Sequence, residues 1–559
     1  MTRLLSLLTL LVCFSAGSFA QTVVNITDAD IQAGQTISWT KDKVYLLDGV
    51  VYVESGAALN IEAGTVVKFT PRADVGNPSA LVIARDAKIF ANGTAAEPII
   101  FTAEADDVNN PTDLGPKDNA LWGGLVVLGN GITQRNGVSP VQVEGIPTTE
   151  PRGQYGGNNN ADNSGVLRYV SIRHGGRQIA SGNELNGLTL GGVGSGTTLE
   201  YIEIYANSDD GIEFFGGAPN LKYAVVAFCE DDCYDWDEVY TGKGQFWFSI
   251  QRDDVADSGG ECDGTTPDDG TPYSNPTVYN WTHIGSGQGA PAANPVGWNL
   301  RAGTAGTLAN CIVTDMKGKG LEVQDKAAGV NDAYAKLVAG ELKLLNNIFY
   351  KIGSFTTIDT GVVGIIRVSA TAEEKGAAAL KTHLTTNQTV VNWSPYLLSI
   401  SRDQSSQLDP RPCPIGSAYT TSRAAVPVGD PFFTTVDYKG AFSTDWNQLW
   451  LRGWSSLARN GHLVTAPIAC ATTSANESDM ANLFSIYPNP AKGMFTVNST
   501  FDEAVGIEIF DLSGRLVQQR INLQSGVQQV DINALGTGMY LIRFRAENGQ
   551  AITKKLIVE

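Results

Sequence analysis

Short runs of β-branched and alternating apolar residues, each ending at a glycine or aspartate turn, recur through the first 470 residues. The clearest repeat places Leu199–Ile204 over Leu221–Val226, 22 residues later, with the apolar positions in step. Strands this short bury a core only when successive repeats stack on one another. The pattern therefore predicts an all-β solenoid, a parallel β-helix with one coil per repeat and coils about 4.8 Å apart.

Side chains alternate between the two faces of a strand, which defines the residues that should point into the solenoid. The expected first residues of five coils are Leu167, Leu199, Leu221, Leu308 and Leu342. The third and fifth residues after the first four leucines are all apolar: Val170, Ile172, Ile202, Ile204, Ala224, Val226, Cys311 and Val313. Longer gaps between coils hold insertions, and short helices are predicted at 332–339 and 372–384.

The ends of a solenoid expose unpaired strand edges, so each end needs a cap. Residues 21–45 are expected to cap the first coil. Near the other end, Trp446, Trp450 and Trp454 follow one another at helical spacing, which predicts one aromatic helical face. We expect this face to seal the C-terminal end of the solenoid. The alternative is a platform for stacking sugar rings.

Two acidic turns occupy corresponding places in the two clearest coils. The first is Asp209-Asp210-Gly211-Ile212-Glu213, and the second, 22 residues later, is Asp231-Asp232-Cys233-Tyr234-Asp235. In both turns the last acidic residue should point away from the core, because its apolar neighbours point inward. Glu213 and Asp235 are therefore expected to stack on the outside of adjacent coils.

A third acidic turn has two possible registers. A strict 22-residue step selects residues 253–257, whereas a four-residue slip selects residues 257–261. The slip restores the acidic spacing and the alternation of inward and outward residues, so we prefer it. It extends the outward ladder to Glu261 and places Asp237 and Asp263 in a second ladder.

Stacked like charges repel one another unless a cation or hydrogen-bond donors lie between them. Calcium binds six to eight oxygens, and stacked acidic turns can supply them. The alternative is that each aspartate accepts hydrogen bonds from backbone N–H groups of its own turn. The four histidines are scattered, and no His/Cys cluster has zinc spacing. The candidate calcium ligands are Asp209, Asp210, Glu213, Asp231, Asp232, Asp235, Asp237, Glu261 and Asp263.

The formal charge of −19 argues against nucleic acid and anionic membranes as partners. Arg3, the apolar run 4–14 and the small residues Ser18 and Ala20 predict a secretory signal peptide over residues 1–20. No later stretch is long and apolar enough to predict a transmembrane helix.

Removal of the signal peptide would leave six cysteines in an oxidising compartment, and six cysteines allow fifteen complete pairings. Cys262 and Cys311 fall at inward positions and are expected to be buried thiols. The expected disulfide cysteines are Cys229 and Cys233, which bracket the second acidic turn, and Cys413 and Cys470, which would close the C-terminal end of the region.

Residues 471–482 are small and polar, as expected of a linker. The following residues, 483–559, form short alternating runs that predict an immunoglobulin-like β-sandwich of about seven strands. The landmarks of this region are Tyr487-Pro488-Asn489-Pro490, Phe510–Arg515, Gly538–Leu541 and Lys554–Glu559. In this order they resemble the type A sorting domain of the type IX secretion system of Bacteroidetes. The resemblance implies recognition by that secretion machinery and export to the cell surface or the medium.

Residues 21–470 resemble a family of secreted Bacteroidetes proteins with a right-handed parallel β-helix. The matching landmarks are Trp122-Gly123-Gly124, Asp209-Asp210-Gly211, Gly244–Trp247 and Val436–Phe442. The resemblance implies a fold and no particular activity.

Two classes of function remain open: a structural, adhesive or glycan-binding surface protein, and a lyase or hydrolase of acidic polysaccharides. Asp231-Asp232 is similar to an aspartate pair of polygalacturonases, but His174-Gly175 precedes the acidic turns instead of following them. A lyase would need a basic residue beside the calcium, for which Arg173, Arg177 and Lys222 are candidates. Arg168, Glu200 and Lys222 share one offset, so a salt-bridged ladder explains Lys222 more simply. We therefore expect a non-enzymatic role.

Overall fold

The computed structural model describes most of the chain. The described residues are 21–72, 78–178, 185–268, 270–292, 295–326, 331–353, 366–370, 377–470, 484–499, 505–512, 514–523, 526–546 and 551–559. The signal peptide predicted over residues 1–20 and the linker predicted over residues 471–482 lie outside them.

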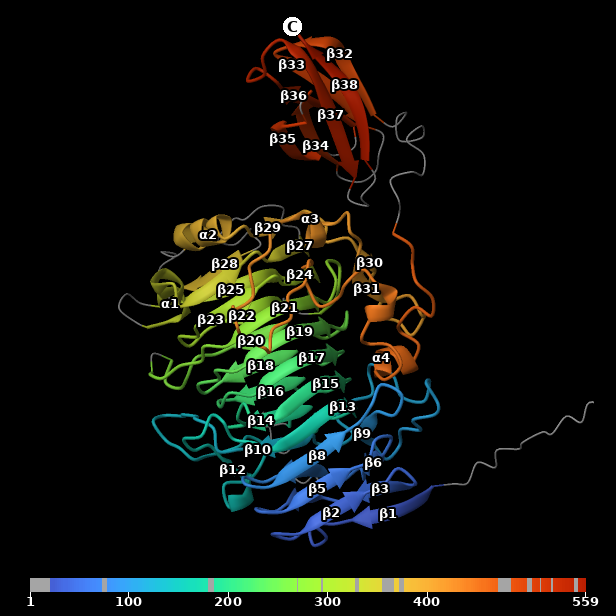
Figure 1. Ribbon diagram of the computed structural model, residues 1–559, viewed down its shortest axis with the longest axis vertical. Coiled ribbons are helices and arrows are strands. Elements are labelled where there is room, and N and C mark those ends of the chain that lie inside the picture. Colours follow the sequence, from blue (N-terminus) through green and yellow to red (C-terminus); the bar gives the residue numbers. More distant parts are fainter. Residues whose placement is uncertain are drawn as a thin grey trace, which may run out of the picture.

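One wall of the solenoid is a parallel sheet of ten described strands that runs nearly the full length of the stack (Figure 1). In stacking order it contains β4 (Val50–Val53), β7 (Ala80–Ile83), β10 (Leu125–Leu128), β14 (Leu188–Gly191), β16 (Ile212–Phe215), β18 (Tyr234–Asp237), β20 (Gly260–Cys262), β22 (Val296–Leu300), β25 (Lys319–Asp325) and β28 (Ile366–Ala370).

The opposite wall is built around long strands that pair in parallel and in register. They are β13 (Gly165–Arg173), β15 (Thr198–Tyr205), β17 (Asn220–Ala227), β19 (Lys243–Ile250) and β21 (Thr277–Ile284). Toward each end these strands continue as two ladders of shorter strands. The shorter strands are β1 (Thr22–Ile26), β2 (Thr36–Trp39), β3 (Lys43–Leu47), β5 (Ala58–Ile61), β6 (Val66–Phe69), β8 (Lys88–Asn92), β9 (Ile99–Ala103), β23 (Gly306–Ala309), β24 (Ile312–Met316), β26 (Leu342–Leu345), β27 (Ile348–Ile352) and β29 (Val390–Val391).

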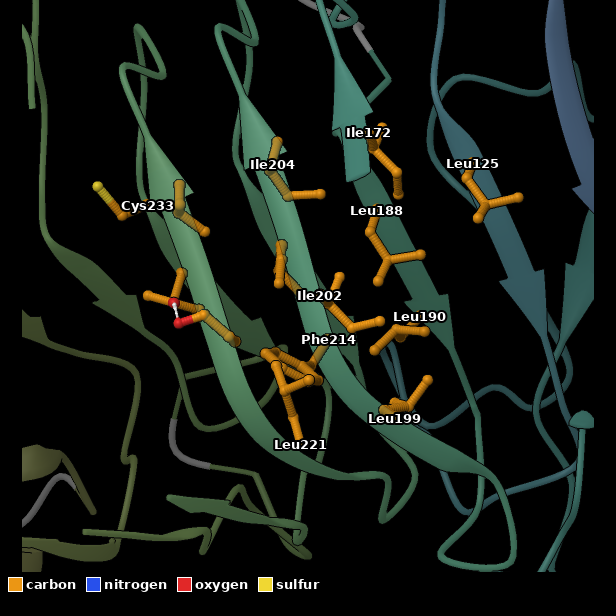
Figure 2. Packing of buried hydrophobic residues seen from close by; sticks show 14 of the residues in the cluster. Leu125, Ile172, Leu188, Leu190, Leu199, Ile202, Ile204, Phe214, Leu221 and Cys233 are labelled. Carbon is orange, nitrogen blue, oxygen red and sulfur yellow. Dashed lines mark hydrogen bonds between the residues drawn. The ribbon is translucent and has the colours of Figure 1, made fainter. Parts of the chain in front are cut away.

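The predicted coil register is confirmed over the central coils, where Leu167, Leu199 and Leu221 stand opposite one another. Their inward neighbours fill the space between the two walls, and Figure 2 shows Ile202 and Ile204 there. One start is wrong by two residues, because Leu308 pairs with Leu344 and not with Leu342. The all-β, parallel β-helix class is confirmed.

Both ends of the stack are closed by chain that continues the coil pattern. Residues 21–45 contribute β1, β2 and the start of β3, which pair with the strands of the next coil. Helix α1 (Ala333–Ala339) forms where a helix is predicted, and α2 (Ala377–Thr386) overlaps the other prediction. Leu380 and Leu384 of α2 are buried in the core at the C-terminal end of the stack (Figure 1).

Residues 395–470, which we call the C-terminal strap, run along the outside of β13, β15, β17 and β19 (Figure 1). The strap contains β30 (Leu397–Ser399), β31 (Asp409–Pro412), α3 (Ser417–Thr420), the 3-10 helix η2 (Trp446–Gln448) and α4 (Ser456–Arg459). The single helical face predicted for the three tryptophans does not form, because turns separate η2 from α4.

The three tryptophans cover the flank of the solenoid and not its C-terminal end. Trp454 packs against Tyr169 and Tyr201, and Trp450 packs against Tyr201. Guanidinium groups of the strap lie 4.0 Å and 5.1 Å from the centroid of the Trp446 ring. These contacts occupy the aromatic surfaces, which favours packing over a sugar platform.

The flank itself is a stack of aromatic rings on the outer side of the long strands. The ring centroids of Tyr169, Tyr201, Tyr223 and Phe246 follow one another at 4.2, 4.5 and 5.1 Å. All four residues have left-handed backbone, with φ between 48° and 59°. This conformation disfavours bulky side chains by about 1–2 kcal/mol per residue, so the stacking and the strap must offset that cost.

Only one of the two expected disulfides is present in the described residues. Cys413 and Cys470 are bonded, and both belong to the strap. The expected bond between Cys229 and Cys233 is wrong: both are free thiols that point into the apolar core and pack there as small hydrophobic side chains. Cys262 and Cys311 are free and buried, as expected.

The sorting domain forms a separate sandwich with its own core. Its strands, in sheet order, are β35 (Leu516–Leu523), β34 (Val505–Asp511), β37 (Gly538–Ala546), β38 (Ala551–Val558), β32 (Phe484–Lys492), β33 (Met494–Ser499) and β36 (Gly526–Asp531). The predicted number of strands is confirmed in the described residues.

A buried carboxylate, Glu203 on β15, fastens the strap to the solenoid. Its side chain is fully buried and accepts hydrogen bonds from the backbone N–H and hydroxyl of Ser456, at 2.7 and 2.9 Å. It also accepts a bond from the hydroxyl of Ser171, which in turn accepts one from Arg173. The hydroxyl of Ser171 therefore bridges the guanidinium of Arg173 and the carboxylate of Glu203.

Glu203→Ala should loosen the strap, because it leaves buried donors of Ser456 without an acceptor. We expect the free energy of unfolding to fall by about 3 kcal/mol. Amide hydrogen exchange around α4 should accelerate. Glu200→Ala on the same strand is the control, since its exposed pair with Arg168 contributes about 1 kcal/mol at most. Unchanged exchange around α4 in Glu203→Ala would contradict this role.

Candidate metal centre in the acidic column

The three acidic turns stack in the register that the four-residue slip predicts. Glu213 on β16 stands opposite Asp235 on β18, and Asp235 stands opposite Glu261 on β20. The acidic side chains of this stack, which we call the acidic column, are Asp209, Asp210, Glu213, Asp231, Asp232, Asp235 and Glu261. Parallel pairing of β16, β18 and β20 therefore brings carboxylates from three consecutive coils together.

The acidic column faces away from the core and is nevertheless largely buried. Asp210, Glu213 and Asp232 are exposed by only 8, 6 and 6%. Residues 130–163, which include β11 (Val141–Gln142) and β12 (Gln154–Tyr155), pack on the outer face of β4, β7, β10 and β16 (teal in Figure 1). Sequence reasoning predicted outward residues but not this covering loop, because its packing is not local.

Some carboxylates of the column accept hydrogen bonds from N–H groups. The backbone donors belong to the next coil, whereas the sequence predicted donors in the same turn as each aspartate. The carboxylate of Asp210 accepts a hydrogen bond from the N–H of Asp232, at 3.0 Å. Asp232 in turn accepts one from the N–H of Ser258, and Glu213 accepts one from the amide of Asn186. These aspartates therefore tie adjacent coils together instead of capping their own turns.

Arg301 neutralises only the C-terminal end of the column. Its guanidinium forms ion pairs with Glu261 and with Asp263, the latter at 2.9 Å. Among the described residues, no ion pair reaches the four carboxylates Asp210, Glu213, Asp232 and Asp235. The Oδ1 atom of Asp235 is buried and accepts no hydrogen bond there.

Three overlapping groups of carboxylates have the spacing of a metal site. In each group, one oxygen from each residue lies within 4.8 Å of the others. The groups are Asp209, Asp210 and Asp231; Asp210, Glu213 and Asp235; and Asp232, Asp235 and Glu261. All donors are oxygens, and they come from several carboxylates, which fits a hard cation such as calcium. Because Asp235 belongs to two groups and Asp210 to two, the middle of the column is the best-supplied place.

The electrostatics of the column favour its neutralisation. Burial raises the pKa of Asp210, Glu213, Asp232 and Asp235 well above ordinary values, and the neighbouring carboxylates raise it further. Burial also raises the pKa of Glu261 to about 7, although Arg301 opposes the shift. Near neutral pH these groups must either hold protons or share a cation.

The second expected ladder, Asp237 and Asp263, lies outside the three metal groups. Burial and then Asp263 raise the pKa of Asp237 to about 7. The next residue, Glu238, is fully buried and accepts hydrogen bonds from Thr133 and Tyr155 and an ion pair from Arg135. The residue that follows Asp237 in the chain, Glu238, therefore binds three residues of the covering loop and helps to hold that loop in place.

Several participants were missed by sequence reasoning. Arg301 and Asn186 lie in coils interrupted by insertions, and no repeat signal sets their register against the column. Arg135 and Tyr155 belong to the covering loop, whose position follows from tertiary packing.

Two of the three basic residues considered as lyase bases lie elsewhere. The third, Arg177, follows Gly176, which packs against Ser208 and Asp209 at the first acidic turn. Arg173 is buried on β13 and donates to Ser171, while Lys222 on β17 donates to Phe432 and Thr434 of the strap. The predicted pair between Arg168 and Glu200 forms at 3.0 Å, but Lys222 does not extend it. These side chains belong to the wall opposite the acidic column.

The raised pKa values predict that the calcium-free protein loses stability as pH rises. The folded column binds more protons than the unfolded chain from the ordinary pKa of each carboxyl up to its folded value, which for Glu261 is about 7. Stability should therefore fall across this window. In chelator, the melting temperature should be lower near pH 8 than near pH 5.

The paired variant Glu213→Gln with Asp235→Asn should flatten this pH dependence. Asp254→Asn should leave it in place, because Arg252 and Lys117 already neutralise Asp254. A melting temperature that rises with pH in chelator, or a pH dependence unaffected by the paired variant, would contradict the assignment.

Comparison with known proteins places both regions of the chain. Residues 30–394 match the family described as pectate-lyase like beta helix domain, and residues 485–559 match the secretion system C-terminal sorting domain. Among the described residues, no helix has the length and apolarity to cross a membrane.

Two individual proteins are similar over short stretches. Ulvan lyase NLR42 of Nonlabens ulvanivorans is 30% identical over 88 residues, which is 16% of this chain and 16% of that protein. The solved structure of PorZ, a surface component of the type IX secretion system of Porphyromonas gingivalis, is 18% identical. That match covers 15% of this chain and 12% of the other, with a TM-score of 0.13. Neither coverage is large enough to transfer an activity.

Proposed function

Since the chain belongs to the family of pectate-lyase like β-helix domains and carries a secretion-system sorting domain, we propose that it is a calcium-stabilised surface protein that binds glycans. Its sorting domain directs export by the type IX secretion system to the cell surface or the extracellular space. Beyond export, we propose a structural, adhesive or glycan-binding role at the surface and the binding of calcium by the acidic column.

The observation that carries the calcium proposal is the set of buried carboxylates without a cationic partner. Asp210, Glu213 and Asp235 bring at least one oxygen each within 4.8 Å of one another. Their desolvation and mutual repulsion disfavour the charged state, and a divalent cation between them would remove both penalties. Backbone donors relieve only part of this, since Asp235 Oδ1 is buried without a hydrogen bond from a described residue.

Calcium fits these ligands better than zinc or magnesium. Zinc sites in proteins are built mainly around histidine and cysteine, and the three groups contain neither. Magnesium demands near-ideal octahedral geometry and keeps several waters, whereas calcium tolerates irregular sets of carboxylates. A calcium ion in the middle of the column would add to the hydrogen bonds by which Asp210 and Asp232 already join adjacent coils.

The surroundings of the column favour a non-enzymatic role. The guanidinium of Arg301 pairs with the C-terminal end of the column and is held there by Glu261 and Asp263. Proton abstraction beside a metal needs a basic group that is free to accept a proton. Arg173 and Lys222 are engaged elsewhere, which leaves Arg177, beside the first acidic turn, as the basic candidate for a lyase.

A polysaccharide lyase is the second candidate. It is favoured by the family name and by the 88-residue similarity to an ulvan lyase. In that case calcium in the column would bind the acid group of a polysaccharide, and a base from outside the column would be required.

Calcium should bind the exported region and raise its stability. At a free calcium concentration about 100-fold above Kd, the gain in unfolding free energy should be about 2.7 kcal/mol. Asp235→Asn should weaken binding at least about tenfold, because Asp235 belongs to two of the three groups. Asp254→Asn should bind calcium like the wild type. Isothermal titration and thermal unfolding with and without chelator provide the measurements, and an unchanged melting temperature would contradict the proposal.

Incubation with acidic polysaccharides separates the two candidate functions. We expect retention of the polysaccharide without unsaturated products or new reducing ends. Calcium-dependent turnover that Asp232→Ala or Asp235→Ala abolishes would instead establish the lyase. Binding without turnover would support the adhesive or glycan-binding role.

A further inference from the structure

The C-terminal strap contains a hollow that the acidic column does not involve. It has a volume of about 660 Å³ and lies between residues 423–425 and residues 435–438, with Ser443 and Gln448 at its edge. Ligand pockets for small molecules have volumes of roughly 300–1,000 Å³, so this one would hold a sugar residue. Part of the wall is the segment Val436–Phe442, which stood out in the sequence without a role.

Both walls of the hollow are fixed to the solenoid by paired hydrogen bonds. The side chain of Asn310 donates to the carbonyl of Ala424 at 2.9 Å and accepts from its N–H at 2.8 Å. Gln245 makes the same pair of bonds with Thr434, both at 2.8 Å. An amide side chain that satisfies both backbone groups of one residue fixes the position of that segment. The hollow is therefore preformed, which lowers the entropic cost of binding.

Close packing fixes the second wall further. Gly440 has a φ of +79°, and a Cβ there would lie 2.4 Å from Thr282 Oγ1. The N–H of Gly440 donates to Asn310 at 2.7 Å, and the carbonyl of Tyr438 accepts from Asn280 at 3.2 Å. This approach explains why a glycine ends the run Asp437-Tyr438-Lys439.

One cation that lines the hollow, Arg423, is available to a negative group. Arg423 is exposed, donates only to carbonyls of its own turn and forms no ion pair among the described residues. Lys439 is fully buried, and its Nζ has no hydrogen-bond partner among them. Burial and then Arg423 lower the pKa of Lys439 to about 7. Lys439 does not line the hollow, so Arg423 is the cation that a negative group in the hollow would contact.

The remaining polar groups suit hydroxyls. Asp437 is exposed and forms no hydrogen bond or ion pair with the described residues. Gln448 accepts a bond from Ser443 at 3.0 Å and keeps its amide group available. Tyr438 adds a half-buried ring to the wall. A guanidinium, a carboxylate, an amide and an aromatic ring around one hollow match a sugar that carries an acid group.

We propose that this hollow binds one residue of an acidic saccharide, with its carboxylate or sulfate at Arg423 and its hydroxyls at Asp437 and Gln448. The inference rests on the proposed glycan-binding function and names the place and the charge of the ligand. The two acid groups share the same chemistry at Arg423, so the choice between them belongs to the experiment.

Binding to the full chain is measured by calorimetry with three probes: an oligogalacturonate, a sulfated galactan oligosaccharide and a neutral cello-oligosaccharide. We expect at least one acidic probe to bind and the neutral one to bind at least about tenfold more weakly. Arg423→Gln and Asp437→Asn should each weaken the acidic probe about tenfold. Arg452→Gln is the control, because it removes the same charge from the strap outside the hollow.

The outcomes separate this inference from the proposed function. Acidic probes that bind the wild type and both hollow variants equally would overturn the hollow and leave glycan binding in place. Equal binding of neutral and acidic probes would overturn the acid specificity. Absence of binding of every probe would overturn both the hollow and the glycan-binding role. Calcium binding measured on Arg423→Gln reports folding, since it should equal that of the wild type.

Discussion

Parallel hydrogen bonding between successive coils forces each side chain to lie directly beside its counterpart in the next coil. With coils about 4.8 Å apart, a residue type that recurs at one position becomes a continuous row. Apolar rows make the core, and they need nothing further. An aromatic row gives the stack from Tyr169 to Phe246, whose faces are satisfied by one another and whose edges are covered by the strap. An acidic row gives the column, where the same spacing is unfavourable.

The structure relieves this repulsion in different ways along the column. Backbone N–H groups of the next coil reach Asp210 and Asp232, and Arg301 reaches Glu261 and Asp263. Between these two regions lies Asp235, whose buried Oδ1 atom accepts no hydrogen bond from the described residues. A cation at this point would complete a sequence of neutralising contacts that the fold itself leaves unfinished.

The parts of the structure that depend on the repeat were predictable from the sequence. The register of Glu213, Asp235 and Glu261, including the slip, follows from the alternation of inward and outward residues. What the repeat does not encode was missed. The covering loop packs against Phe215, the strap lies on the flank, and Cys229 and Cys233 remain thiols in the core. The first two depend on where a non-repeating segment packs in three dimensions, which local periodicity does not specify.

The most direct measurement is a crystal structure of the exported region grown with calcium, with anomalous data that identify the ion. We expect an anomalous peak among the carboxylates of Asp210, Glu213 and Asp235, with oxygen distances of about 2.3–2.6 Å. Carboxyl groups that bond directly to one another through shared protons, with no ion between them in saturating calcium, would contradict the account.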